Sequence, residues 1–163
     1  MATSGRITLS AWRNTMKMLR ICVALTTTIG LSILAFAADF KPYPGAKLDE
    51  EATRDSAEAA RKADPAATAA VYTTSDPFAK VAAFYKELGT EYAMPMASGT
   101  SGKPKKRAGY DLWEAYFILD GAQDLARSRL WVKVQNPAIG LYADEMHPVN
   151  IRAVTVIILS QKK

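Results

Sequence analysis

The most constraining feature of this chain is its last apolar segment, residues 151–159, which reads IRAVTVIIL. A strand with one solvated face alternates polar and apolar side chains, whereas this run is almost continuously apolar and rich in β-branched residues. It therefore predicts a central strand that is covered on both faces. The small side chains of Ala153 and Thr155 would admit a helix closely, so we assign a helix to the odd-numbered positions. The opposite face then carries Val154, Val156 and Ile158.

Three other segments have strand patterns. Residues 110–119 place apolar side chains at every second position, and residues 127–135 alternate Leu130, Val132 and Val134 with bulkier or polar side chains. Asn136-Pro137 ends the second of these segments, because proline has no N–H for a sheet ladder. Residues 69–74 read as a short strand, and the Gly/Ser/Pro-rich residues 90–108 read as a loop.

The strongest helix pattern lies between Asp76 and Gly89. Asp76 is expected to cap the free amides of the first turn, Pro77 to take the first helical position, and Gly89 to provide a left-handed exit. The apolar side chains recur at helical spacing on one face, at Phe78, Val81, Ala82, Tyr85 and Leu88. This helix should therefore cover one face of the sheet.

A second helical segment, residues 48–63, is rich in Ala, Glu, Arg and Lys, with Asp49 as its cap and Pro65 as its stop. Its apolar residues are almost all alanine, so it has little to bury. The predicted fold is α+β: an antiparallel sheet of about four strands, one main amphipathic helix on one face and this Ala-rich N-terminal helical segment. The second face could be covered by the Ala-rich segment, a long loop, a partner subunit or a ligand.

The N-terminus predicts export. Basic residues precede an apolar run over residues 21–34, and Ala35-Phe36-Ala37 matches a small-x-small cleavage site, so we expect a signal peptide over residues 1–37 and a single domain over residues 38–163. The apolar run is too short for a stable membrane anchor. Cys22, the only cysteine, lies in this peptide, so the exported domain would be disulfide-free in the periplasm or outside the cell.

The distribution of charge along the chain argues against nucleic-acid binding. Residues 1–37 contain basic but no acidic side chains, and the remaining 126 positions are almost neutral in net charge. Nucleic-acid binding needs a concentrated basic face, which this composition does not favour. The local cluster Lys103, Lys105, Lys106 and Arg107 lies in a loop-like stretch and is typical of a solvated surface.

Several short motifs occur in a recognisable order, from Tyr43-Pro44-Gly45-Ala46-Lys47 through Tyr72-Thr73-Thr74-Ser75-Asp76 to Phe84-Tyr85 and the final strand. In this order the chain resembles small exported bacterial proteins of uncharacterised function, in which a YPGA segment precedes a YTTSD-capped helix ending in FY. The resemblance implies a bacterial envelope setting. It transfers no catalytic residue to this chain.

No catalytic constellation emerges from the residues. Cys-His catalysis and multi-histidine zinc sites are excluded, because the domain has one histidine, His147, and no cysteine. Asp111 and Glu114 have opposite parity on one strand, so they should face opposite sides of the sheet and not form a catalytic pair. We therefore expect a protein that is not an enzyme and uses no cofactor.

Two binding hypotheses remain. The first is an envelope module that contacts a protein partner or forms a homodimer through a sheet face, with Trp131, Val154, Val156 and Ile158 as interface candidates. The second is a periplasmic binding protein for a small ligand or copper(I). Thioether and imidazole ligands suit copper(I), and the candidate ligands are Met94, Met96, Met146 and His147.

Overall fold

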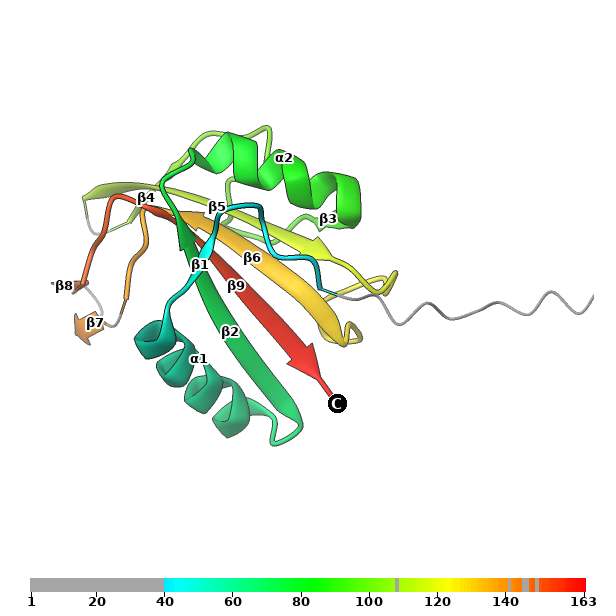
Figure 1. The fold of residues 1–163 in the computed structure, drawn as a ribbon. Coiled ribbons are helices and arrows are strands. Elements are labelled where there is room, and N and C mark those ends of the chain that lie inside the picture. The colour runs from blue at the N-terminus through cyan, green and yellow to red at the C-terminus, as the bar shows by residue number, and fades with distance from the viewer. Residues whose placement is uncertain (1–39, 108, 141, 145–146, 149) are drawn as a thin grey trace, which may run out of the picture. The chain divides into compact units, whose positions relative to one another are not determined.

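The computed structural model describes residues 40–163 except positions 108, 141, 145, 146 and 149. The predicted signal peptide and its cleavage site lie outside the described residues. The described part is α+β, as predicted (Figure 1). It is built on an antiparallel sheet with two helices, α1 (Glu50–Ala63) and α2 (Phe78–Leu88).

The sheet of the described residues has seven strands, more than the four or so that we predicted. Along the sheet, the strands follow the order β1 (Lys47–Leu48), β2 (Ala67–Thr74), β9 (Thr155–Lys162), β6 (Leu130–Asn136), β5 (Tyr110–Ile118) and β3 (Thr90–Tyr92), while β4 (Lys105–Arg107) also pairs with β5. A separate two-stranded sheet joins β7 (Tyr142–Asp144) and β8 (His147–Pro148). The additional strands of the main sheet are two or three residues long and lie towards its margins.

Strand β9 is central, with β2 on one side and β6 on the other. It begins at Thr155, four residues later than predicted, because Arg152 instead pairs with Ala138 in an isolated bridge. The pairing of Ile157 with Val134 and of Ile158 with Lys133 sets its register against β6. The apolar C-terminal segment is thus the middle of the sheet, as its composition predicts.

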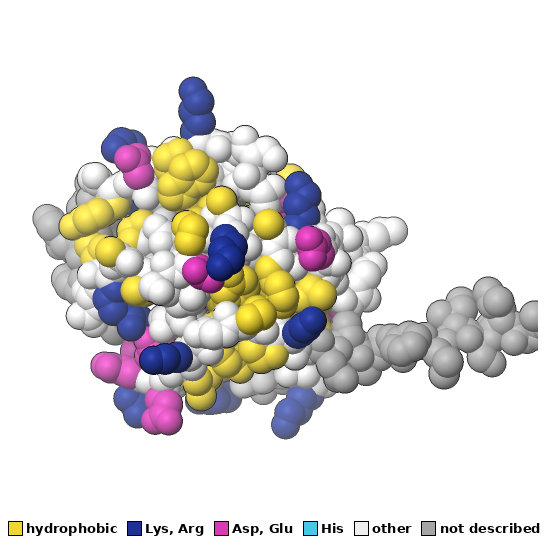
Figure 2. All heavy atoms as spheres, turned by 45° about the horizontal axis from the view of Figure 1, so that its top comes forward, with side chains coloured by type: hydrophobic (Ala, Val, Ile, Leu, Met, Phe, Trp, Pro, Cys, Tyr) yellow, Lys and Arg dark blue, Asp and Glu magenta, His cyan; other side chains and the backbone are white. Residues whose placement is uncertain are grey.

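Helix α2 covers one face of the sheet and forms the main core. Val81 and Tyr85 are completely buried against the side chains of Phe117, Val132 and Val134, and the odd-numbered Ile157 and Leu159 of β9 join the same cluster. The assignment of the helix to the odd-numbered positions is therefore correct. The side of the molecule that carries α2 mixes apolar, basic and acidic side chains (Figure 2).

Helix α1 lies against the opposite face, beside β2 and β9. Val156 is buried with Val71 and Ala138, and Ala52 of α1 packs against this second cluster together with Val154 and Ile158. Asp49 caps α1 as predicted: its side chain accepts a hydrogen bond from the Ala52 amide at 3.0 Å. The Ala-rich segment is therefore an ordered helix that covers part of the second face.

Three predictions about the ends of α2 are wrong: the side-chain cap from Asp76, the first helical position of Pro77 and the left-handed exit at Gly89. Pro77 occupies the cap position and no side chain caps the first turn, because the Asp76 carboxylate is used elsewhere. It accepts hydrogen bonds from the Tyr43 hydroxyl at 2.6 Å and from Lys80 Nζ at 3.0 Å. Gly89 has an extended backbone with φ of −157°, not a left-handed one. Glycine is required there by space, since a Cβ atom would collide with the carbonyl oxygen of Ile118.

The YPGA segment clamps the start of the domain to α2. Pro44 and Gly45 form a turn in which Gly45 has a φ of +78° and the Ala46 amide donates to the Tyr43 carbonyl at 3.0 Å. The buried Tyr43 ring meets the Phe84 ring edge-on, with the centroids 5.3 Å apart. These motif residues therefore have structural roles in the described domain.

Candidate ligand-binding cleft

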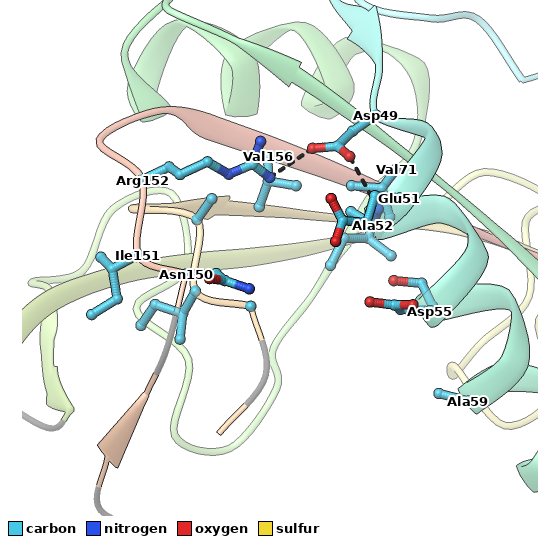
Figure 3. A pocket seen from close by; sticks show the side chains of 15 residues that line it. Asp49, Glu51, Ala52, Asp55, Ala59, Val71, Asn150, Ile151, Arg152 and Val156 are labelled. Carbon is cyan, nitrogen blue, oxygen red and sulfur yellow. Dashed lines mark hydrogen bonds and ion pairs between the residues drawn. The ribbon is translucent and has the colours of Figure 1, made fainter. Parts of the chain in front are cut away.

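A cleft of about 510 Å³ opens on the α1 side of the sheet (Figure 3). Helix α1 forms one wall, and the segments 138–140 and 150–152 form the other. Its floor consists of side chains from β2 and β9. The volume falls within the range of 300–1,000 Å³ that is usual for small-molecule sites. We refer to this space, defined by these three sets of residues, as the α1 cleft.

The floor of the α1 cleft is apolar because successive side chains of a strand point to opposite faces of the sheet. Val71, Val156 and Ile158 all point away from α2, and Val71 pairs directly with Ile158 across the strands. Val71 and Val156 are buried, whereas Ile158 is half-buried. Val156 and Ile158 are interface candidates from the sequence, and in the structure they line the cleft.

The composition of α1 explains why the space beside it is open. The helix presents Ala52, Ser56 and Ala59 to the cleft, and these short side chains cannot fill the gap to the opposite wall. Thr53 fixes the helix to β2, since its hydroxyl accepts from the Val71 amide at 2.9 Å and donates to the Val71 carbonyl at 3.3 Å. A helix with little to bury thus leaves a cleft of defined shape.

The opposite wall is held by backbone hydrogen bonds. The Ala138 amide donates to the carbonyls of Arg152 and Val154 at 3.0 and 3.1 Å, and the Arg152 amide donates to the Ala138 carbonyl at 2.9 Å. Asn150 has a left-handed backbone with φ of +56°, which asparagine tolerates better than most residues. These contacts present Ile139 and Ile151 towards the cleft.

One ion pair joins the two walls. Arg152 Nη2 lies 2.7 Å from Asp49 Oδ2, and the Asp49 side chain is largely buried (Figure 3). The pKa of Asp49 is lowered, chiefly by the hydrogen bond from the Ala52 amide and further by Arg152, against the opposing effect of burial. Asp49 therefore both caps α1 and holds the 150–152 segment against the helix.

Two further carboxylates border the cleft, from Glu51 and Asp55. They stand one helical turn apart on α1, and Figure 3 shows both extending towards the opposite wall. Among the described residues, neither forms an ion pair or a hydrogen bond through its side chain. Among the described residues, the cleft lining therefore has three carboxylates and one guanidinium, and only the Asp49 carboxylate is paired.

The structure separates the remaining interface candidates from the cleft floor. Val154 packs beside the cluster of Val71, Ala138 and Val156. Trp131 lies on the same sheet face but on β6, where its ring meets Tyr116 with the centroids 6.1 Å apart. Lys133 lies over the Tyr116 ring and pairs with Glu114, so a polar network occupies this part of the face.

The residues predicted as copper(I) ligands are only partly described. Met94 lines a smaller cavity of about 260 Å³ between β3 and the loop that follows it, while Met96 is 83% exposed. His147 lies on β8, and Met146 lies outside the described residues. The copper(I) hypothesis therefore stays a prediction.

Sequence reasoning missed several residues of the α1 cleft. Asp49 was recognised only as a cap, and Glu51, Asp55 and Arg152 were not singled out. The spacing of Glu51 and Asp55 on an Ala-rich helix is a signal that could have indicated a shared acidic edge. Nothing in the sequence pattern places Arg152 beside Asp49, because that contact depends on the tertiary fold.

Comparisons with protein-family models, with curated proteins and with solved structures give no match for this chain. Among the described residues, no helix is long and apolar enough to cross a membrane, and no group of three or more His, Cys, Asp or Glu side chains could hold a metal ion. The geometry of the α1 cleft is therefore the main indication of function.

Proposed function

We propose that this protein is an exported, non-catalytic module that binds a small molecule in the α1 cleft. The main support is that the cleft combines a suitable volume with an apolar floor of Val71, Val156 and Ile158. Small-molecule sites are concave, mainly apolar and edged by a few polar groups. The α1 cleft has this composition, with Val71, Val156 and Ile158 at its floor and its charged side chains in the walls.

Contacts within the domain hold the two walls of the cleft in place. The Asp49–Arg152 ion pair and the hydrogen bonds of Thr53 hold α1 and the 150–152 segment in place. A site that is already formed loses less conformational freedom on binding, which favours affinity. This arrangement supports binding of a ligand better than it supports contact with a flat protein surface.

Blocking the cleft tests the proposal. Ala59 is exposed on α1 and lines the cleft, so Ala59→Trp should fill the space without disturbing the core. A matched variant, Arg61→Trp, places the same ring on an exposed helix position that does not line the cleft. The probes are small molecules with a 3-phenylpropyl group, whose binding is followed by NMR titration. We expect Ala59→Trp to weaken their affinity at least tenfold and Arg61→Trp to keep it within about twofold of the wild-type value. Equal binding by both variants would contradict the proposal.

Contact with a protein partner or a second copy through the sheet face is the second candidate function. The half-buried rings of Trp131 and Tyr116 favour it, since aromatic side chains are enriched in interfaces. Val156 favours it less, because α1 and Ala138 already bury this side chain within one copy of the domain. A substitution at Val156 distinguishes the two arrangements and is described in the Discussion.

A further inference from the structure

We propose that the ligand of the α1 cleft is an amphipathic organic cation, whose ammonium or guanidinium group binds between Glu51 and Asp55 while its apolar body covers the floor. This inference depends on the proposed function of the cleft and specifies its ligand. It follows from which charged groups at the cleft are already satisfied and which are not.

The one positive side chain that lines the cleft among the described residues is already in an ion pair. Arg152 is paired with Asp49, and the same carboxylate accepts the Ala52 amide at the start of α1. An anionic ligand at Arg152 would compete with Asp49 for the guanidinium and would lie near the carboxylates of Glu51 and Asp55, which border the same cleft. The cleft therefore disfavours anions.

The negative groups are available. Glu51 and Asp55 have no ion-pair partner among the described residues, and both extend from α1 across the open side of the cleft (Figure 3). A cation between them would interact with two carboxylates at once, because residues four positions apart on a helix are neighbours on its surface. The helix thereby provides a recognition site for one positive group.

The apolar floor favours an organic cation over a metal ion. Calcium requires six to eight oxygen ligands, whereas this edge offers two free carboxylates above valine and isoleucine side chains. An organic cation instead uses both parts of the site, since its carbon skeleton gains about 25 cal/mol for each Å² of apolar surface removed from water. The two halves of the ligand thus match the two halves of the cleft.

Three probes of nearly equal shape test the charge preference on the full protein: 3-phenylpropylammonium, 3-phenylpropanol and 3-phenylpropanoate. NMR titration should show the ammonium compound binding at least about fivefold more tightly than the alcohol, with the propanoate weakest. Raising the salt concentration should weaken only the ammonium compound, because salt screens charges near the surface. Equal affinity for the alcohol, or tighter binding of the propanoate, would overturn the cation assignment and leave the cleft function intact.

A matched pair of variants tests the residues. Glu50 and Glu51 both lie in the first turn of α1, but only Glu51 lines the cleft. Glu51→Gln and Asp55→Asn should each weaken the ammonium compound about three- to fivefold, while Glu50→Gln leaves it unchanged. The affinity for the alcohol should not change in any of the three, which shows that the cleft is still formed. An equal effect of Glu50→Gln would show that only general charge is involved and would overturn the assignment.

Calcium chloride provides the last comparison. If calcium shifts the amide signals of Glu51 and Asp55 more strongly than 3-phenylpropylammonium does, the carboxylates form an inorganic cation site and the organic-cation proposal is wrong. If none of the three phenylpropyl probes binds in the cleft, the proposed function itself fails. The two failures are therefore separable in one set of titrations.

Discussion

Asp76 shows how one residue can connect distant segments of the domain. Its carboxylate accepts hydrogen bonds from Tyr43 and Lys80, and its backbone carbonyl accepts one from the buried Thr155 hydroxyl at 2.7 Å. The first two contacts lower the pKa of Asp76, with the Tyr43 hydroxyl as the larger cause. The residue thereby joins the N-terminal segment, α2 and β9.

Removal of the Tyr43 hydroxyl should change the acid stability of the protein. Because the folded-state pKa of Asp76 lies below its unfolded value near 3.8, its contribution is present above about pH 4 and disappears as the pH falls through the folded pKa. Tyr43→Phe should therefore be less stable than the wild type at pH 7, and the difference should shrink below pH 4. Urea denaturation at several pH values measures this, with Tyr110→Phe at an exposed position as the control.

A stability difference for Tyr43→Phe that stays constant from pH 7 to pH 2 would show that packing, and not the contact with Asp76, accounts for the effect. This contact could not be predicted from the local pattern. An aspartate that precedes a proline is typical of a helix cap, whereas the carboxylate of Asp76 accepts from Tyr43, which is 33 positions away in the chain.

At the scale of elements, β9 and α1 decide what covers the second face of the sheet. Val156 is only 5% exposed beneath α1 and Ala138, so Val156→Asp would bury a carboxylate without a partner. We expect this variant to lose about 3 kcal/mol or more of stability and to unfold, whereas Val156→Thr should lose less. Circular dichroism measures whether each variant is folded, and sedimentation velocity measures whether it is a monomer or a dimer.

A Val156→Asp protein that is fully folded and monomeric, beside a dimeric wild type, would contradict this arrangement. It would show that a second copy covers the face and would favour the interface candidate function. Both cases were open from the sequence, and contact with a partner or a second copy was the leading hypothesis. An Ala-rich helix has few apolar side chains to indicate where it packs, and here Thr53 and the Asp49–Arg152 ion pair position it.

Elements with strong internal patterns were predictable, and elements that depend on a neighbour were not. The core face of α2 at Phe78, Val81, Ala82 and Tyr85 and the parity of β9 follow from side-chain spacing, which is a local property. Leu88 was predicted on the same face of the helix but is exposed at its C-terminal end. Strands β3 and β4 were expected to be part of a loop, because residues 90–108 are rich in glycine and lysine. They are strands because β5 provides a partner for their backbone groups.

At the scale of the whole molecule, the α1 cleft results from a division of the sheet into two differently covered faces. Helix α2 fills its face with large side chains, whereas α1 covers the other with alanines and leaves room beside β9. The apolar residues of the floor could be predicted from their parity. The opposite wall could not, because the segments 138–140 and 150–152 meet α1 only through the tertiary fold.

Amide chemical-shift mapping with 3-phenylpropylammonium shows where on the protein a small molecule binds. If the α1 cleft is the binding site, the largest shifts should occur at the cleft floor and at α1, including Val71, Val156 and Glu51, with little change on β5 and β6. Shifts concentrated around Trp131 and Tyr116, with the floor of the cleft unaffected, would contradict binding in the α1 cleft.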